Sequence, residues 1–119
     1  MSNVDLFNKN LVQFLDNLSK IIGIQYYTEL IDKKKNNMTN ILYLKNDILI
    51  DLFNKNIYKY KDDIIKENIN ILSEINKLEL FEGLDITKIL QNMSDKNKII
   101  FWNYLKAFIL LCEKHYYTL

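Results

Sequence analysis

The sequence predicts a single all-α domain spanning residues 1–119. Three observations support this fold class. The chain has no proline and two glycines, so few residues interrupt a helix. Apolar residues recur at steps of three and four along most of the chain, which is the spacing of one helix face. From Ile99 to Cys112 nearly every residue is apolar. We therefore expect a compact bundle of about five to six helices around a central hydrophobic C-terminal helix at about residues 95–115.

The first helix is predicted by an apolar stripe close to the N-terminus. Ser2 can cap its start, because a serine oxygen accepts a hydrogen bond from an unpaired N–H of the first turn. Gly23 is expected just past its end, where a left-handed residue commonly follows a helix. The stripe consists of Val4, Phe7, Leu11, Phe14, Leu18 and Ile21.

A short second helix is predicted around residues 27–31, where Tyr27, Leu30 and Ile31 have helical spacing. It should run into Lys33–Asn37, a stretch of three lysines and two asparagines. Such a run is typical of a solvated connection, so we interpret it as an exposed loop.

A third helix should begin at Thr39 or Asn40, either of which can act as its cap. Apolar residues cover more than half of its circumference, which predicts a helix packed on two sides. It either continues beyond residue 56 or bends near Asn54–Asn56, since no glycine or proline marks a break there. Its apolar residues are Ile41, Leu42, Leu44, Ile48, Leu49, Ile50, Leu52 and Phe53.

The C-terminal half contains three further helical signals. Residues 69–78 have apolar spacing for a turn or two before Gly83. Asp85 can cap a short helix, and Ser94 can cap the last one, with Asp95 in its first turn. The apolar run in that last helix is shorter than the roughly 20 residues of a membrane span and contains Lys106, so no membrane span is predicted.

Charge and cysteine content restrict the possible functions. The net charge is +1 and all 16 basic residues are lysines, so the chain lacks the arginine fork that reads phosphate and guanine. Nucleic-acid binding is therefore disfavoured. The single cysteine excludes an internal disulfide, and no secretion signal is recognisable, so an intracellular protein that is not secreted is expected.

No constellation for catalysis, metal binding or cofactor binding is found in the sequence. Cys112 and His115 share a helix face, but Cys112 continues an apolar stripe, where a buried thiol is inert. Asp47 and Asp51 at i and i+4 are typical of the solvated side of a helix. Two glycines cannot form a phosphate-binding loop. We expect no catalytic, cofactor-binding or metal-binding residues.

The eight tyrosines are divided by the apolar pattern. Tyr43, Tyr60 and Tyr104 lie on apolar stripes and are expected in the core. The others are poorly placed for a core, and tyrosine is enriched at protein interfaces, so they form our candidate interface. These candidates are Tyr26, Tyr27, Tyr58, Tyr116 and Tyr117.

The hexapeptide DLFNKN occurs at residues 5–10 and again at residues 51–56. Flanking residues match in kind over the same amphipathic stripe and then diverge, so a solenoid is excluded. An old duplication of a helical hairpin is one explanation. The favoured one is that two segments occupy equivalent positions around the same central helix, which predicts inward Phe7 and Phe53 and outward Lys9 and Lys55.

One resemblance to a family is found. Met93–Lys98 followed by Ile100–Leu105 resembles small, uncharacterised, all-helical proteins of nucleocytoplasmic large DNA viruses, of the mimivirus and phycodnavirus kind. The similarity covers most of the chain but departs from the family pattern at Glu67–Leu72. The matching residues are mostly core and capping residues, so the resemblance implies a fold and transfers no functional residue. Further matches are Phe7-Asn8, Leu11, Phe14, Leu15, Leu18, Leu52-Phe53 and Tyr60–Ile64.

The leading functional hypothesis is a non-enzymatic viral protein that acts by protein–protein interaction, as a small virion or assembly component. Its partner would be a viral or host protein, or a second copy of the chain, in the host cytoplasm or the virion. One alternative is a host-directed regulator, similar to death-regulating bundles, that binds a host helix in a groove. A second alternative is weak nucleic-acid binding through lysines, with an affinity that falls steeply with salt.

Overall fold

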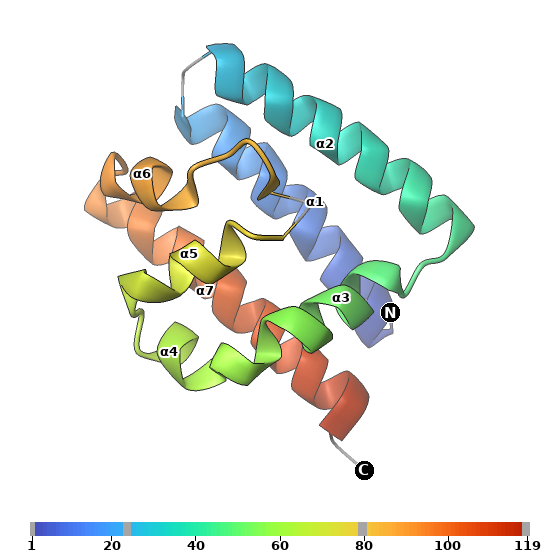
Figure 1. Cartoon of the computed structure of the whole chain (residues 1–119). Coiled ribbons are helices and arrows are strands. Elements are labelled where there is room, and N and C mark those ends of the chain that lie inside the picture. Colours follow the sequence, from blue (N-terminus) through green and yellow to red (C-terminus); the bar gives the residue numbers. More distant parts are fainter. Residues whose placement is uncertain (1, 23–24, 79–80, 118–119) are drawn as a thin grey trace.

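A computed structural model describes residues 2–22, 25–78 and 81–117, except for the side chains of Ile22, Gln25, Tyr26 and Tyr27. These residues form an all-α fold without strands (Figure 1). It contains seven α-helices where about five to six were expected, because the middle of the chain folds as several short turns. Its α-helices are α1 (Asn3–Ile22), α2 (Gln25–Leu44), α3 (Ile48–Asn56), α4 (Lys61–Ile65), α5 (Leu72–Ile75), α6 (Ile86–Gln91) and α7 (Asp95–Cys112).

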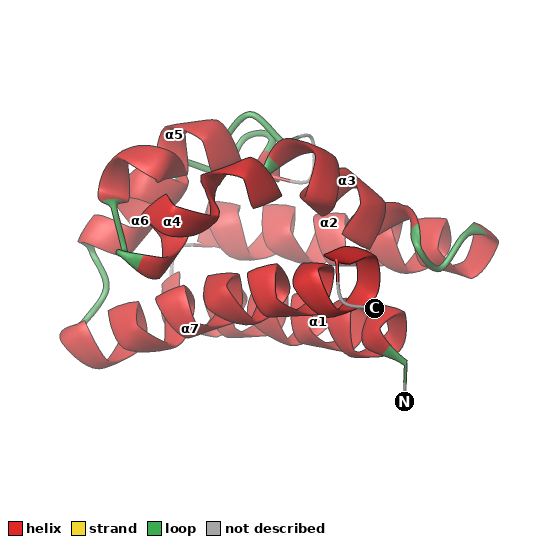
Figure 2. Ribbon diagram, turned by 90° about the horizontal axis from the view of Figure 1, so that it is seen from below, coloured by secondary structure: helices red, strands yellow, loops and turns green. Residues whose placement is uncertain are grey.

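The long helices α1 and α7 lie side by side and form one layer, with α3 to α6 stacked above them (Figure 2). Helix α2 is antiparallel to α1 and flanks the upper layer (Figures 1 and 2). Short 3₁₀ turns at Tyr58–Tyr60 and Ile69–Ile71 join the upper helices, and a π-helical turn at Glu113–Tyr117 follows α7. Within the described part of the chain, every helix is too short or too polar to cross a membrane.

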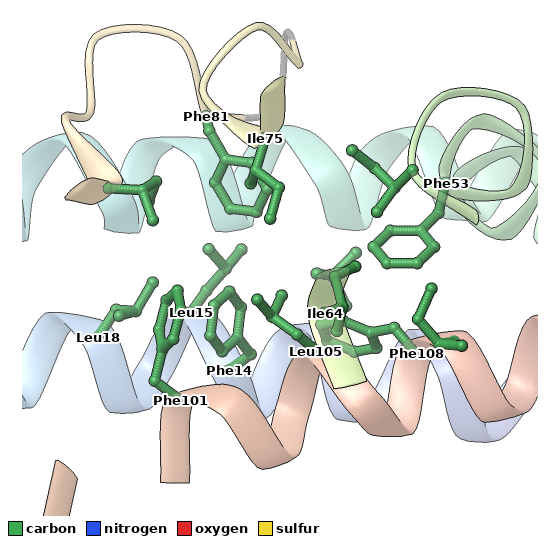
Figure 3. Close-up of a cluster of buried hydrophobic side chains, with 14 of the residues drawn as sticks. Phe14, Leu15, Leu18, Phe53, Ile64, Ile75, Phe81, Phe101, Leu105 and Phe108 are labelled. Atoms are coloured by element: carbon green, nitrogen blue, oxygen red, sulfur yellow. The ribbon is translucent and has the colours of Figure 1, made fainter. Parts of the chain in front are cut away.

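Aromatic rings occupy the space between the two layers. Phe14 and Phe101 in the lower layer face Phe81 and Ile75 from the upper layer (Figure 3). Phe7 and Phe53 are both buried, contact each other at a centroid distance of 5.6 Å and both contact Phe108 of α7, at 5.1 and 5.6 Å. Lys9 and Lys55 are exposed. The packing prediction for the two hexapeptide copies is therefore confirmed.

The side-chain caps predicted at three helix starts are present. The Asp5 N–H donates to Ser2 Oγ at 3.1 Å, and the Lys88 N–H donates to Asp85 Oδ1 at 3.1 Å. Ser94 Oγ accepts from the Asn97 N–H at 3.2 Å. Gly83 precedes the second of these helices with φ of +84°, a conformation that favours glycine. Gly23, predicted to end α1, lies outside the described residues.

Replacing Ser94 by alanine tests the cap of α7. The Asn97 N–H would lose its acceptor, so we expect the free energy of unfolding to fall by about 1 kcal/mol. Ser73→Ala is the matched control, because the Ser73 hydroxyl donates to the Asn70 carbonyl at 3.0 Å and caps no N–H. Urea denaturation would measure both variants, and equal losses would contradict the capping role.

The prediction of an exposed loop at Lys33–Asn37 was wrong, because α2 runs through this segment without a break. Ile31 and Met38 are both buried and stand two helical turns apart, so a continuous helix directs both toward the core. Lys35 Nζ also donates to Asp16 Oδ1 of α1 at 2.6 Å. That hydrogen bond is the main cause of the raised pKa of Lys35.

The predicted third helix is also corrected. Thr39 does not cap a helix, since its hydroxyl donates to the Lys35 carbonyl inside α2 at 2.9 Å, and Asn40 is likewise helical. The helical run then breaks at residues 45–47, before α3. At the other end, α3 stops at Asn56 and the chain bends there, which decides between the two predicted courses.

Several residues of the predicted apolar faces are solvent-exposed. Tyr43 is 92% exposed, because the C-terminal end of α2 extends past the helices that pack on the rest of it (Figure 1). In α7, Phe101, Leu105 and Phe108 are buried, whereas Ile99 is 62% exposed. Apolar residues therefore occupy more of the circumference of α7 than its neighbours α1, α3 and α4 cover.

Candidate functional site

Catalytic chemistry through the cysteine and histidine gains no support from the structure. Cys112 is fully buried, and burial raises the pKa of its thiol to about 12, with a further contribution from the negative charge of Asp51. His115 is exposed in the terminal turn, with its ring 4.6 Å from that of Tyr116. Among the residues with described side chains, no group of three or more histidines, cysteines or carboxylates could hold a metal ion.

Three of the five candidate interface tyrosines come together where α7 ends. The ring of Tyr117 stacks on Tyr58 at a centroid distance of 4.7 Å, and its hydroxyl donates to Asn54 Oδ1 at 3.1 Å. Tyr116 lies next to Tyr117, with ring centroids 6.2 Å apart, and is partly exposed. The side chains of Tyr26 and Tyr27 lie outside the described part of the chain.

A carboxylate holds this cluster to the upper layer. Glu113 Oε1 accepts from Tyr58 Oη at 3.1 Å and from Lys61 Nζ. The hydrogen bond from Lys61, followed by that from Tyr58, holds the pKa of Glu113 below its usual range. Tyr58 and Tyr117 thus fasten the terminal turn to α3 and the 3₁₀ turn behind it. Their role as a protein interface stays a prediction, and Tyr58 is half-buried by these contacts.

Glu113→Gln tests this fastening. The amide cannot neutralise Lys61, so we expect faster backbone hydrogen exchange in the Glu113–Tyr117 turn while the exchange of α1 stays unchanged. Because the pKa of Glu113 is lowered in the fold, the wild-type protein should reproduce this loosening only as the pH falls below the ordinary carboxyl range. Lys114→Gln, on the same turn and exposed, is the control. Equal exchange in the two variants would contradict the role of Glu113.

A more exposed apolar surface lies at the end of α2. Ile41, Tyr43 and Leu44, which we call the α2 tip, are 42%, 92% and 86% exposed. The tip is anchored, because Asn8 Nδ2 of α1 donates to the Asn46 carbonyl in the following turn at 2.7 Å. Large apolar side chains that are this exposed and held in place are a feature of binding surfaces.

Beside the tip, a pocket of about 570 Å³ opens between the two layers. We call it the α2–α3 pocket. Its floor is formed by α1 and α7, and its walls by α2 on one side and by α3 and residues 75, 77, 78, 81 and 82 on the other. Its apolar lining residues are Phe7, Leu11, Met38, Ile41, Leu49, Leu52, Phe53, Ile75, Leu78, Phe81, Leu105 and Phe108.

The polar residues of the α2–α3 pocket are all partly or largely exposed, which places them at its mouth. Lys34 and Asn37 come from α2, whereas Asn56, Lys77 and Glu82 come from the opposite wall. Lys77 Nζ also contacts Glu74 Oε1 at 3.1 Å on the surface of α5. The interior of the pocket is therefore hydrocarbon and its mouth carries two amines and one carboxylate.

Neither the α2 tip nor the pocket was predicted from the sequence. The tip residues have the helical spacing of a core stripe, and the only sequence signal of exposure is the polar turn that follows them at residues 45–47. The pocket depends on the separation of five segments distant in the chain, which residue spacing does not encode. Comparison with models of known protein families, with curated proteins and with solved structures finds no match to this chain. The resemblance to viral helical proteins stays a prediction.

Proposed function

We propose that this chain acts by binding a protein partner rather than by catalysis, and that the α2 tip is its main contact. The observation that carries the proposal is the exposure of Tyr43 and Leu44, at 92% and 86%, on a helix end fixed to α1. A buried tyrosine contributes a large apolar area together with a hydroxyl at low entropic cost, and tyrosines are frequent among the residues that dominate binding energy.

The chemistry of the tip specifies the partner surface. Tyr43 and Leu44 need an apolar recess, and the exposed Lys45 next to them favours a carboxylate at its edge. Because Asn8 already holds the turn after the tip, little conformational entropy is lost when the partner binds. The resemblance to proteins of large DNA viruses supports a role as a small virion or assembly component.

Affinity capture from infected cells would test the proposal with two matched variants. We expect the double variant Tyr43→Lys/Leu44→Lys to lose a partner that the wild-type protein retains, with an affinity loss of about thirtyfold, the order of magnitude for removing one dominant residue. Ile99→Lys is the control, since Ile99 is an exposed apolar residue of α7, in the lower layer. A partner lost equally in both variants, or in neither, would sink the proposal.

The identity of the captured partner separates the two biological settings. A capsid or other virion protein supports an assembly role, and purified virions should then contain this chain by mass spectrometry. A host protein lost in the tip variant supports the host-directed alternative. Sedimentation of the purified chain adds the third case, because a dimer that dissociates in the tip variant would identify the partner as a second copy.

A further inference from the structure

The bend between α2 and α3 is made by three residues, Lys45, Asn46 and Asp47, which we call the α2–α3 turn. It contains no glycine or proline, and its residues suit a helix as well as a turn. Within the described part of the chain, Glu67 is the one non-glycine residue with positive φ, so all three turn residues have negative φ. Asp47, at φ −98° and ψ 3°, already lies close to the helical region. The turn can therefore become helical without any residue changing the sign of its φ.

The start of α3 lacks hydrogen bonds that a continuous helix would supply. The Asp47 carboxylate accepts none from the first turn, although aspartate is a preferred cap. The Ile48 N–H reaches the Lys45 carbonyl at 3.4 Å, beyond the usual distance for such a bond. In a continuous helix, the first N–H groups of α3 would donate to carbonyls at the end of α2 and in the turn. Straightening gains these bonds and gives up the one from Asn8 Nδ2 to the Asn46 carbonyl.

Straightening also aligns apolar side chains on either side of the turn. Ile41, Leu44, Ile48 and Leu52 are separated by three, four and four residues, so a continuous helix would place them on one face, which we call the hinge stripe. In the bent form Ile41, Leu44 and Leu52 are 42%, 86% and 45% exposed, and Ile48 is only partly buried. The stripe is nearly symmetric about the turn. Two straightened helices that cross antiparallel at the turn would therefore pair Ile41 with Leu52, and Leu44 with Ile48, between two copies.

A straightened turn would carry the hairpin of α1 and α2 away from the rest of its chain. Phe7 and Phe14 of α1 would then lose their contacts with Phe108 of α7, whose ring lies 5.1 and 5.7 Å away. Leaving these buried rings in water is unfavourable. A second straightened copy presents the same vacated core, so each hairpin can make identical contacts with the other chain. Exchange between two copies thus restores the core and buries the hinge stripe as well.

We propose that two copies of this chain form a domain-swapped dimer. Each copy exchanges its α1–α2 hairpin through a straightened α2–α3 turn, and the two continuous helices cross at the hinge stripe. The proposal rests on the proposed function in one respect, since it names a second copy as a partner that covers Ile41 and Leu44 of the α2 tip. Because exchange requires the core to open, the dimer should form slowly from folded monomers and readily when a concentrated sample refolds.

Refolding over a range of protein concentrations, followed by sedimentation, tests the role of the turn. Asn46→Ala/Asp47→Ala favours helix through the turn, whereas Asn46→Gly/Asp47→Gly disfavours it, and both leave the hinge stripe intact. Alanine and glycine differ about fivefold per residue in helix equilibrium, and the dimer contains four such positions, so the alanine variant should dimerise up to about 500-fold more tightly. The wild type should lie between them. Equal dimer fractions in the two variants, or an alanine variant that stays monomeric throughout, would overturn the proposal.

The hinge stripe is tested by charged substitutions. Leu44→Lys/Leu52→Lys should weaken dimerisation at least about tenfold, because two lysines per chain would enter an apolar contact. Leu110→Lys is the matched control, since Leu110 is 49% exposed on α7 and lies outside the stripe, and it should dimerise as the wild type does. Equal weakening by both variants would contradict the crossing of the two helices at the stripe.

Isotope-filtered NMR of dimers mixed from labelled and unlabelled chains distinguishes exchange from pairing of two surfaces. In the swapped dimer, Phe7 of one chain packs on Phe108 of the other, at the ring distance of 5.1 Å found within the fold. Nuclear Overhauser effects between labelled and unlabelled chains at this contact are expected. A dimer in which the contact stays within each chain would overturn the proposal. The glycine variant retains the side chains of the α2 tip, so partner capture with this variant tests the proposed function separately from the swap.

Discussion

Phe14→Ala is expected to destabilise the fold by about 4 kcal/mol, since replacing a buried phenylalanine by alanine typically costs 3–5 kcal/mol. Phe14 is 2% exposed, and its ring lies 5.4–6.3 Å from four others. Two of these rings belong to opposite layers, Phe81 above and Phe108 below, so the substitution removes contacts that hold the layers together. Against a typical total of 5–15 kcal/mol, this loss is a large fraction of the stability.

Urea denaturation of two comparison variants shows whether the ring contacts are responsible. Leu6→Ala, also on α1 but 36% exposed, should cost less than about 1 kcal/mol. Phe14→Leu keeps most of the buried volume and should fall between the two, at about 1.5 kcal/mol, because the ring contacts are lost without a large cavity. If Phe14→Ala cost no more than Leu6→Ala, the two-layer core described above would be wrong.

The fold class and the helix caps were predictable from the sequence because local chemistry determines them. Ser2, Asp85 and Ser94 each supply an oxygen three residues before the N–H that they accept, which is a relation within one turn. The continuity of α2 was not predictable from composition, since the lysines and asparagines of Lys33–Asn37 suit a loop as well as a helix. Burial of Ile31 and Met38 and the contact between Lys35 and Asp16 decide between them, and these depend on α1.

The tyrosines show the same limit of sequence-based prediction for candidate functional residues. Tyr43 has the spacing of a core residue and is exposed, because the end of α2 extends past the helices that pack on the rest of it. Tyr58 has the spacing of a surface residue and is half-buried, since the terminal turn covers it and Glu113 accepts a hydrogen bond from its hydroxyl. In both cases the outcome depends on where a distant segment ends, so periodicity alone assigns the residue to the wrong environment.

The second large expected effect is the slow reaction of the single cysteine in the folded protein. At pH 8 the thiol of Cys112 should react with a disulfide reagent at least about a thousandfold more slowly in the folded protein than in urea. The pKa of this thiol is raised from 9.0 to about 12 by burial and by Asp51, so the reactive thiolate is scarcer by about three orders of magnitude, and burial blocks access as well. Cys112→Ser/Ser73→Cys is the control, because residue 73 is exposed and its new thiol should react at the rate of the unfolded chain. Fast labelling of native Cys112 would place it outside the core.

The same shift predicts how stability depends on pH. Since the folded-state pKa of Cys112 lies above the unfolded value, the folded protein holds the thiol proton to higher pH, and this contribution is complete below about pH 9. Between about pH 9 and 12 it should be lost progressively, by roughly 1 kcal/mol for each pH unit, because the unfolded thiol ionises first. Cys112→Ala removes the titrating group, so the difference in unfolding free energy between wild type and variant should shrink over this range, whatever the lysines and tyrosines contribute to both. A constant difference would mean that Cys112 ionises equally in both states and is therefore not buried in the folded protein.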